Sequence, residues 1–259
     1  MPRRSCLVFL LLLSLCVGSA ELAAAQTTAA FTLRGKSLTL HLYGKPDGAP
    51  VIVSSGDGGW VHLGPHAAEV LAAAGFFVVG IDSKEYLSAF TSGSITLTVD
   101  NVPADFKAFV DYAAGKSKAA RPILVGVSEG AGLSVLAAAS PVVQSAIRGV
   151  VVLGLPDINE LGWRWRDAVI YITKKVPNEP TFSAAAFIGR VAPLPLAALH
   201  STSDEFVPVA EIQRLMAAAK EPKQLWLIKA DSHAFGGNEQ EFNARLVEAM
   251  AWVKQRSNQ

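Results

Sequence analysis

The sequence predicts an α/β protein with a mostly parallel sheet that is flanked by helices. Short apolar runs alternate with helical segments along most of the chain, which is typical of parallel strands joined by right-handed crossovers. The first of these runs is preceded by a segment of the antiparallel type. No G-x-G-x-x-G motif follows that run, so a dinucleotide-binding fold is not favoured. Of the 259 residues, 51% are hydrophobic, enough for a large core in one domain.

The first 25 residues have the pattern of a secretory signal peptide. Arg3 and Arg4 are followed by an apolar run at 7–17 and by small residues at 18–20 and 23–25, which offer two cleavage sites. The apolar run is short for a membrane-spanning helix, which needs about 20 residues, so an uncleaved anchor is less favoured. We therefore expect a periplasmic or secreted protein.

The composition of the remaining domain, residues 26–259, narrows its chemistry. Both cysteines, Cys6 and Cys16, precede it, so it would contain no disulfide, zinc–thiolate site or cysteine nucleophile. A lipid anchor at Cys16 is not favoured, because Leu15 precedes it where a small residue is usual. The formal net charge of +1 gives no indication of a nucleic-acid partner. We expect no metal or other cofactor.

The predicted strands change in kind along the chain. Residues 31–43 form two short strands around Gly35-Lys36, and alternation in the second one indicates a half-exposed antiparallel edge. From residue 51 the strands are continuous apolar runs, as in strands buried on both faces of a sheet. These runs are Val51–Val53, Phe77–Ile81, Ile123–Val127, Val150–Leu153, Leu196–Leu199 and Leu225–Ile228.

Helical segments separate these strands. The predicted helices are Pro65–Ala74, Val102–Ala114, Ala131–Ala139, Val209–Ala219 and Glu239–Lys254. An antiparallel N-terminal edge followed by this alternation is the layout of the α/β-hydrolase fold. Residues 155–191 interrupt the alternation with aromatic and charged side chains, and we expect them to form a helical, lid-like insertion over the active site.

The strongest local motif is a G-x-S-x-G sequence at residues 126–130, centred on Ser128. A buried strand precedes it and a helix of small residues follows it. In this context the sharp turn exposes the serine hydroxyl, and the glycines permit close packing of strand and helix. The sequence therefore predicts Ser128 as a nucleophile.

A serine nucleophile needs a histidine base and an acid that orients it. In this fold the chain order is serine, acid, histidine. His233 lies in a loop between the last strand and the last helix, where the base is expected, whereas His200 lies at a strand end. Asp204 follows a strand after a short turn and is the preferred acid. The alternative acids are Glu205 and Asp231.

Two backbone N–H groups are needed to stabilise the developing oxyanion. One is expected from Glu129, directly after the nucleophile. The other is expected from the glycine-rich loop 54–60, where either Gly56 or Asp57 is the donor. Glycines there let the backbone approach a ligand closely.

The rest of this loop is expected to contact the substrate through Gly58, Gly59 and Trp60. Asp82, at the end of the second parallel strand, either lines the pocket or caps a turn. His62 and His66 have the spacing of metal ligands on a helix, but no third ligand is evident, so we interpret them as surface or helix-start histidines.

The loop and three further segments together resemble the VirJ/AcvB family of bacterial virulence-associated proteins. Residues 55–60 read S-G-D-G-G-W, and residues 78–86 are similar to that family's V-V-G-x-D-S-x-x-Y. The resemblance resumes at residues 126–131 and at His233 and Phe235. It implies a periplasmic α/β-hydrolase with Ser128, Asp204 and His233 as the triad. AcvB-type members are associated with hydrolysis of aminoacylated phosphatidylglycerol, and the VirJ branch with type IV secretion.

The sequence departs from the family at the nucleophile. The family usually reads G-Y-S-F-G-A-D, whereas residues 126–132 here place Glu129 and Gly132 where that pattern has phenylalanine and aspartate. The family's cysteine near the acid loop also has no counterpart. A carboxylate at Glu129 could attract an aminoacyl ammonium group or face solvent.

We expect an exported ester hydrolase for a small-molecule or lipid ester, with an aminoacyl phospholipid as the leading substrate. The alternatives are a non-catalytic accessory protein of secretion and a general carboxylesterase. Trp163, Arg164, Trp165 and Arg166 are expected either to contact a membrane surface peripherally or to fill the core of the insertion.

Overall fold

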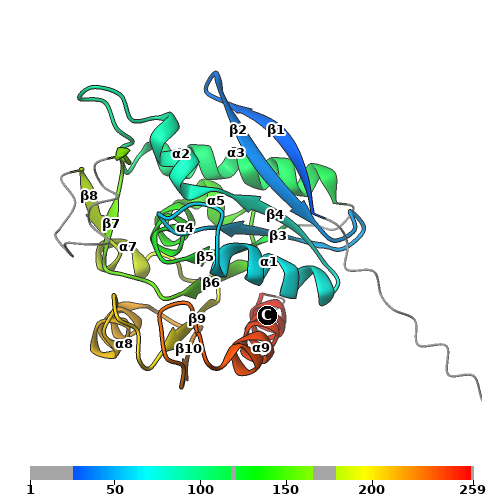
Figure 1. Cartoon of the computed structure of the whole chain (residues 1–259), viewed down its shortest axis with the longest axis vertical. Coiled ribbons are helices and arrows are strands. Elements are labelled where there is room, and N and C mark those ends of the chain that lie inside the picture. Colours follow the sequence, from blue (N-terminus) through cyan, green and yellow to red (C-terminus); the bar gives the residue numbers. More distant parts are fainter. Residues whose placement is uncertain (1–25, 118–120, 166–178, 258–259) are drawn as a thin grey trace, which may run out of the picture.

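The computed structural model describes residues 26–117, 121–165 and 179–257. The predicted signal peptide and Arg166 lie outside these ranges. Eight strands form one sheet in the order β1-β2-β4-β3-β5-β6-β9-β10 (Figure 1). β1 pairs with β2 and β2 with β4 in antiparallel orientation, and all other neighbours are parallel. The predicted mostly parallel sheet with an antiparallel N-terminal edge is confirmed.

The strands of this sheet are β1 (Thr27–Leu33), β2 (Lys36–Tyr43), β3 (Ala49–Ser54), β4 (Phe76–Ile81), β5 (Ile123–Val127), β6 (Gly149–Leu153), β9 (Leu196–Ser201) and β10 (Lys223–Ile228). The helices around it are α1 (Leu63–Ala73), α2 (Ser83–Ala89), α3 (Asn101–Lys116), α4 (Glu129–Ala138), α5 (Pro141–Gln144), α7 (Ala185–Ile188), α8 (Val209–Ala218) and α9 (Glu239–Arg256). None of the described helices is long and apolar enough to cross a membrane.

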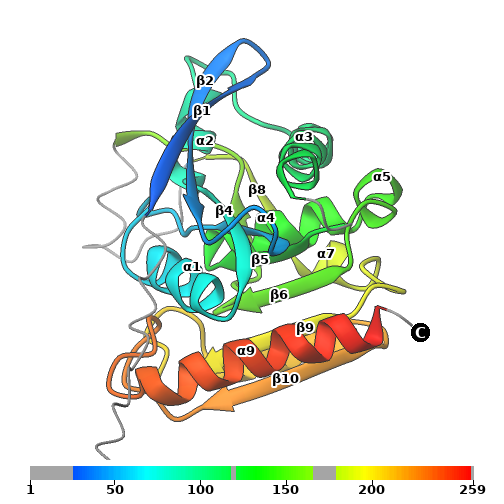
Figure 2. The same cartoon turned by 90° about the vertical axis from the view of Figure 1, so that its right-hand side faces the viewer.

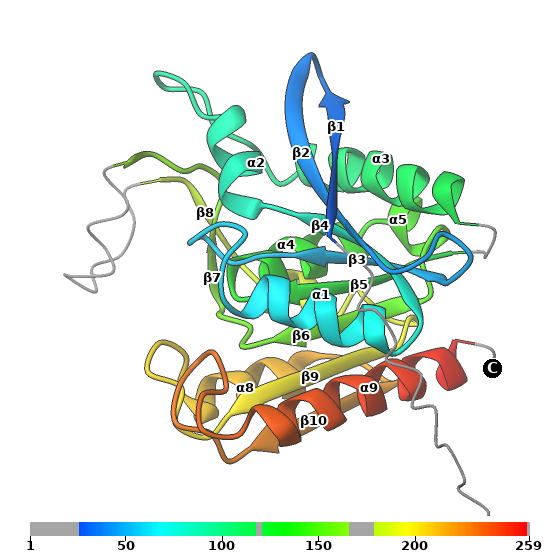
Figure 3. The same cartoon turned by 45° about the vertical axis from the view of Figure 1, so that its right-hand side comes forward.

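Helices cover both faces of the sheet, because the parallel strands are apolar on both sides. α1 and α9 bury one face, where Leu71 and Phe242 belong to the same cluster as Val53 and Leu153. Figure 3 shows these two helices in front of the sheet, and Figure 2 shows α9 lying along β9 and β10.

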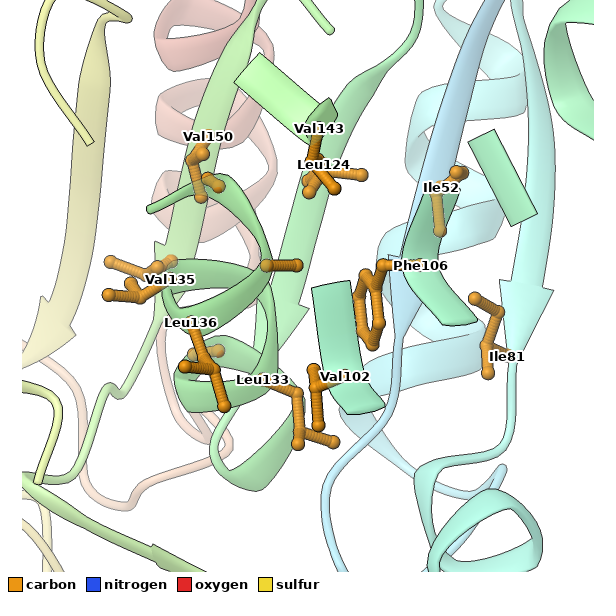
Figure 4. Packing of buried hydrophobic residues seen from close by; sticks show 14 of the residues in the cluster. Ile52, Ile81, Val102, Phe106, Leu124, Leu133, Val135, Leu136, Val143 and Val150 are labelled. Carbon is orange, nitrogen blue, oxygen red and sulfur yellow. The ribbon is translucent and has the colours of Figure 1, made fainter. Parts of the chain in front are cut away.

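The opposite face packs against α3 and α4. Figure 4 shows Phe106 of α3 and Leu133 of α4 in the same apolar layer as Ile52 and Leu124 of the sheet. β10 differs from the sequence expectation because it is the last strand of the sheet. Ile228 is fully buried, but the other side chains of β10 are partly buried or exposed, and Leu227 is 41% exposed.

The described part of the insertion after β6 contains strands as well as the helical structure that we expected. Its described part contains an antiparallel pair, β7 (Ile158–Glu160) and β8 (Thr181–Ser183), followed by the short helix α7. An extended β7 lets successive side chains point in opposite directions. Ile158 is accordingly 51% exposed, whereas Asn159 is fully buried. Residues 166–178 of the insertion lie outside the described part.

The strand order brings the two predicted catalytic loops together. β3 pairs with β5, with Ser54 opposite Gly126, so the loop after β3 and the turn after β5 leave the sheet side by side. Figure 3 shows the loops after β3, β9 and β10 and the β7–β8 pair at the same end of the molecule. Ligands of open α/β sheets bind at this carboxyl end of the parallel strands.

Candidate active site

Ser128 lies on a strained turn between β5 and α4. Its φ is 49° and its ψ is −115°, a region that non-glycine residues rarely occupy. Such a conformation costs about 1–3 kcal/mol and persists only where the surroundings impose it. A Cβ on Gly126 would overlap the backbone of Gly130 and Ala131, and one on Gly130 would overlap the carbonyl of Ser54. The two glycines of the motif therefore let the strand, turn and helix pack closely enough to hold Ser128 in place.

His233 and Asp204 are joined by a hydrogen bond. Nδ1 of His233 lies 2.6 Å from Oδ2 of Asp204, whose side chain is fully buried. The other carboxylate oxygen, Oδ1, accepts the N–H groups of Phe206 and Val207 at 2.9 and 2.8 Å. Burial alone would raise the pKa of Asp204. The hydrogen bond to His233, the charge of His233 and the two N–H groups outweigh this effect and lower the pKa below its usual value. The carboxylate is thus kept ionised beside the imidazole.

The alternative residues from the sequence have other roles. Glu205 accepts the backbone N–H of His233 at 2.7 Å, so it holds the loop rather than the ring. Asp231 packs against Gly237 within its own loop. His200 is fully buried, and its Nε2 lies 2.9 Å from the carbonyl oxygen of Val207. Burial lowers the pKa of His200, which favours a neutral ring behind Asp204.

Ser128 and His233 line one cavity of about 460 Å³. This volume lies within the range of about 300–1,000 Å³ usual for small-molecule sites. Nε2 of His233 is buried and has no hydrogen-bond partner among the described residues. The imidazole fits here because Gly154, at φ 60°, has no side chain: a Cβ there would lie 2.5 Å from Cε1 of His233. Catalytic hydrogen bonds often form fully only when substrate is bound.

The loop after β3 forms the wall of the cavity beside the nucleophile. A Cβ on Gly56 would lie 3.4 Å from Cβ of Ser128, so this backbone passes directly next to the serine. The Gly59 N–H donates a hydrogen bond to the carbonyl oxygen of Gly56 at 3.1 Å, and the Trp60 N–H donates one to Oδ2 of Asp82 at 3.0 Å. Those two N–H groups are therefore not oxyanion donors, and Gly56 and Asp57 remain the predicted ones with Glu129.

The structure places two predicted substrate-binding residues outside the cavity wall. Gly58 and Gly59 line it, but Trp60 and Asp82 do not. The Trp60 ring lies over Gly80, stacks on His41 with ring centroids 4.7 Å apart, and donates its Nε1–H to the Tyr43 hydroxyl. Asp82 caps α2 by accepting the Glu85 N–H and also holds the Trp60 backbone. Both residues therefore support the loop without lining the cavity.

Three carboxyl groups converge next to the nucleophile. Glu129 and Glu160 are each only 6% exposed, and Oε1 of Glu129 accepts the backbone N–H of Glu160 at 2.6 Å. Burial raises the pKa of Glu129 well above its usual value, and the charges of Glu160 and Asp57 raise it further, against the opposing effect of that hydrogen bond. Glu129 does not face solvent. The three residues give the cavity a strongly acidic wall.

We expect Glu129→Gln to stabilise the folded protein increasingly as the pH rises. In the unfolded chain Glu129 loses its proton near its ordinary pKa of 4.5, whereas in the folded protein its raised pKa keeps the proton bound to higher pH. The free energy of unfolding of the wild type therefore falls as the pH rises above 4.5. Urea unfolding should show a gain for the variant at about pH 8 and little change at about pH 4. The exposed Glu69→Gln is the control, and an equal gain at both pH values would contradict the expectation.

Gly132, which stands where the family pattern has aspartate, has a packing explanation. A Cβ on Gly132 would overlap the side-chain amide of Asn159, which is fully buried against α4. The Asn159 amide donates to the carbonyls of Pro156 and Asp157. Gly132 therefore makes room for the insertion to dock on the nucleophile helix.

Apolar side chains surround the mouth of the cavity. Val61, Ile158 and Phe206 line it and are 49%, 51% and 54% exposed. Phe206 also packs edge-on against His233, with ring centroids 5.6 Å apart. Trp165, in the insertion, is 72% exposed. The exposed Trp165 does not fill the core of the insertion.

Sequence reasoning missed several residues of this site. Gly154 gives no signal except its place directly after β6, and Glu160 and Ile158 lie in the irregular insertion. His62 was interpreted only as a surface or helix-start residue, yet it also lines the cavity. Among the described residues, no group of three or more His, Cys, Asp or Glu side chains is arranged to hold a metal ion.

The protein has the α/β-hydrolase fold. Residues 49–162 match the model of the family described as "Bacterial virulence protein (VirJ)". The predicted resemblance to the VirJ/AcvB family is therefore confirmed over this segment, which contains the loop after β3, the nucleophile turn and β7. No curated protein matches the sequence.

Solved structures resemble this chain over most of its length. Est1E from Butyrivibrio proteoclasticus has a TM-score of 0.65 at 16% identity, covering 88% of this chain and 99% of that one. An esterase from Pyrococcus furiosus has a TM-score of 0.66 at 19% identity, covering 88% and 91%. A monoacylglycerol lipase from Paleococcus ferrophilus has a TM-score of 0.57 at 19% identity, covering 85% and 100%. At these identities the likeness shows the fold.

Proposed function

We propose that this protein is a serine ester hydrolase that uses Ser128, His233 and Asp204. The observation that carries the proposal is the strained Ser128 in the same cavity as the hydrogen-bonded His233–Asp204 pair. The α/β-hydrolase fold and its esterase and lipase neighbours support it.

In the first half of the reaction, Oγ of Ser128 attacks the ester carbonyl carbon while Nε2 of His233 takes the hydroxyl proton. Asp204 stabilises the resulting imidazolium through Nδ1. The N–H of Glu129 and one from Gly56 or Asp57 stabilise the oxyanion. The C–O bond to the alcohol then breaks, and His233 returns the proton to the leaving oxygen, which leaves an acyl group on Ser128.

In the second half, water attacks the acyl carbon and gives its proton to His233. The bond to Ser128 Oγ breaks, the serine regains the proton, and the free acid leaves. The sum is ester plus water to acid plus alcohol.

For the substrate we propose an aminoacyl ester of an amphipathic lipid, such as aminoacyl-phosphatidylglycerol. The acidic wall supports this choice, because Glu129, Glu160 and Asp57 repel one another unless a proton or a cation lies between them. An aminoacyl group carries its ammonium close to the ester carbonyl, and Glu129 directly follows the nucleophile. The resemblance to AcvB-type proteins points to the same substrate.

The direct test incubates the purified protein with vesicles that contain lysyl- or alanyl-phosphatidylglycerol and measures free amino acid against Ser128→Ala. Release by the wild type alone is expected. No release, together with turnover of short nitrophenyl esters, would make the protein a general carboxylesterase. No turnover of any ester would favour the non-catalytic accessory protein.

We expect Glu160→Gln to reduce kcat/KM for an aminoacyl ester by about 10- to 100-fold, the usual worth of a hydrogen bond to a charged group. The change keeps the size of the side chain and removes its charge, and the backbone N–H that Glu129 accepts is unaffected. Steady-state kinetics on alanyl and acetyl esters of one alcohol measure the effect. An equal loss on both esters would mean that Glu160 does not recognise the ammonium.

We also propose that the mouth of the cavity contacts a membrane surface peripherally. Val61, Ile158 and Phe206 expose apolar area around the entrance, and the exposed Trp165 is of a residue type that favours the membrane interface. Phe206→Ser should weaken turnover of the vesicle-borne ester more than that of a water-soluble one. Equal effects on both would refute the contact.

Export stays a proposal that rests on the N-terminal sequence. N-terminal sequencing of the native protein should find a start near Glu21 or Gln26. An intact Met1 on cytoplasmic protein would refute export.

A further inference from the structure

His62 has the same unusual backbone conformation as the nucleophile. Its φ and ψ are 54° and −115°, against 49° and −115° for Ser128. Each residue directly precedes a helix, and neither side chain caps that helix. A glycine would adopt this conformation without strain, so a histidine here indicates that the position needs a side chain.

His62 lies at the catalytic cavity. His62 lines the cavity together with Ser128 and His233, and it is solvent-exposed. Glu129 and Glu160, in contrast, are buried within the same cavity. His62 therefore belongs to the mouth of the cavity and the two carboxyl groups to its interior.

The cavity lining is uneven in charge. Among the described residues that line it, only His62 and His233 have side chains of the basic type, and His233 is hydrogen-bonded to Asp204. Four lining residues are acidic, namely Asp57, Glu129, Glu160 and Glu205. Glu205 is turned to the backbone N–H of His233. A substrate with both charges would place its cation inside and its anion towards His62.

We propose that His62 is a specificity-determining residue that binds an anionic phosphate in the alcohol part of the substrate. This inference rests on the proposed ester hydrolysis and adds the recognition of the leaving alcohol. In an aminoacyl phospholipid, the ammonium and the phosphate lie on opposite sides of the ester bond. The ammonium then meets Glu129 and Glu160, and the phosphate accepts a hydrogen bond from the His62 imidazole.

The experiment compares two water-soluble esters with the same acyl group, alanyl-glycerol and alanyl-glycerophosphoglycerol, which differ in the phosphodiester. The wild type should prefer the phosphate-bearing ester by about tenfold in kcat/KM, mostly through KM, because the contact is made in both ground and transition states. His62→Gln and His62→Gly should lose the preference. The glycine variant also removes the backbone strain, so its loss cannot be attributed to a weakened fold.

Two further variants act as controls. His62→Lys restores a positive charge and should retain the preference. His66→Gln should retain it as well, because His66 lies one helical turn further on and bonds Asn243 at 2.7 Å, outside the cavity lining.

The outcomes separate this inference from the function on which it rests. Equal turnover of the two esters by the wild type, or a preference that survives in both His62→Gln and His62→Gly, would overturn the role of His62 and leave the hydrolase intact. Failure to cleave either ester above the Ser128→Ala background, with nitrophenyl esters still cleaved, would overturn the aminoacyl substrate and the inference together.

Discussion

Ser128→Ala is expected to reduce ester turnover by about four to six orders of magnitude. The change removes the attacking oxygen, and what remains is the contribution of the oxyanion donors and of substrate binding. The folded structure should persist, because alanine has the same Cβ at the same backbone angles, φ 49° and ψ −115°. Single-turnover assays on a nitrophenyl ester, with circular dichroism to check the fold, measure both effects.

A second serine on the same helix provides the control. Ser134 is fully buried in α4, where its hydroxyl donates to the carbonyl of Gly130 at 2.7 Å, and it does not line the cavity. Ser134→Ala should therefore change turnover little. If Ser128→Ala keeps wild-type turnover, the nucleophile has been assigned wrongly.

Asp204→Asn is expected to lower kcat by about 10⁴-fold while the protein stays folded. The asparagine oxygen can still accept the N–H groups of Phe206 and Val207. Its amide nitrogen then faces Nδ1 of His233 and makes that atom an acceptor, which places the ring proton on Nε2. A ring with its proton on Nε2 cannot accept the serine proton.

Glu205→Gln is the matched comparison for this acid. The glutamine oxygen can replace the carboxylate as acceptor of the His233 backbone N–H, so a loss below about tenfold is expected. Steady-state kinetics of the two variants, normalised by active protein, decide between the carboxyl groups. A larger loss in Glu205→Gln than in Asp204→Asn would reverse the assignment.

The sequence predicted the sheet well because its parallel strands are buried on both faces and give continuous apolar runs. The turn around Ser128 and the loop with Asp204 follow directly from strands of this kind, so their positions could be predicted too. β10 was misjudged because an apolar run does not reveal whether a strand lies at the edge of a sheet.

Residues that act through tertiary contacts could not be found in this way. β7 is short and lies in the irregular insertion, and Glu160 meets Glu129 only when β7 docks on α4. Gly154 supports the imidazole of a residue far along the chain. The S-G-D-G-G-W motif marks the loop but does not reveal the direction of the Trp60 side chain, which packs on Gly80 and His41.

The most direct test of the catalytic assignment is peptide mass spectrometry of the wild-type protein after reaction with a fluorophosphonate probe. A single adduct per chain is expected on the peptide that contains Ser128, and Ser128→Ala should carry none. An adduct on a different residue, or ester turnover by a wild-type protein that the probe does not label, would contradict Ser128 as the nucleophile.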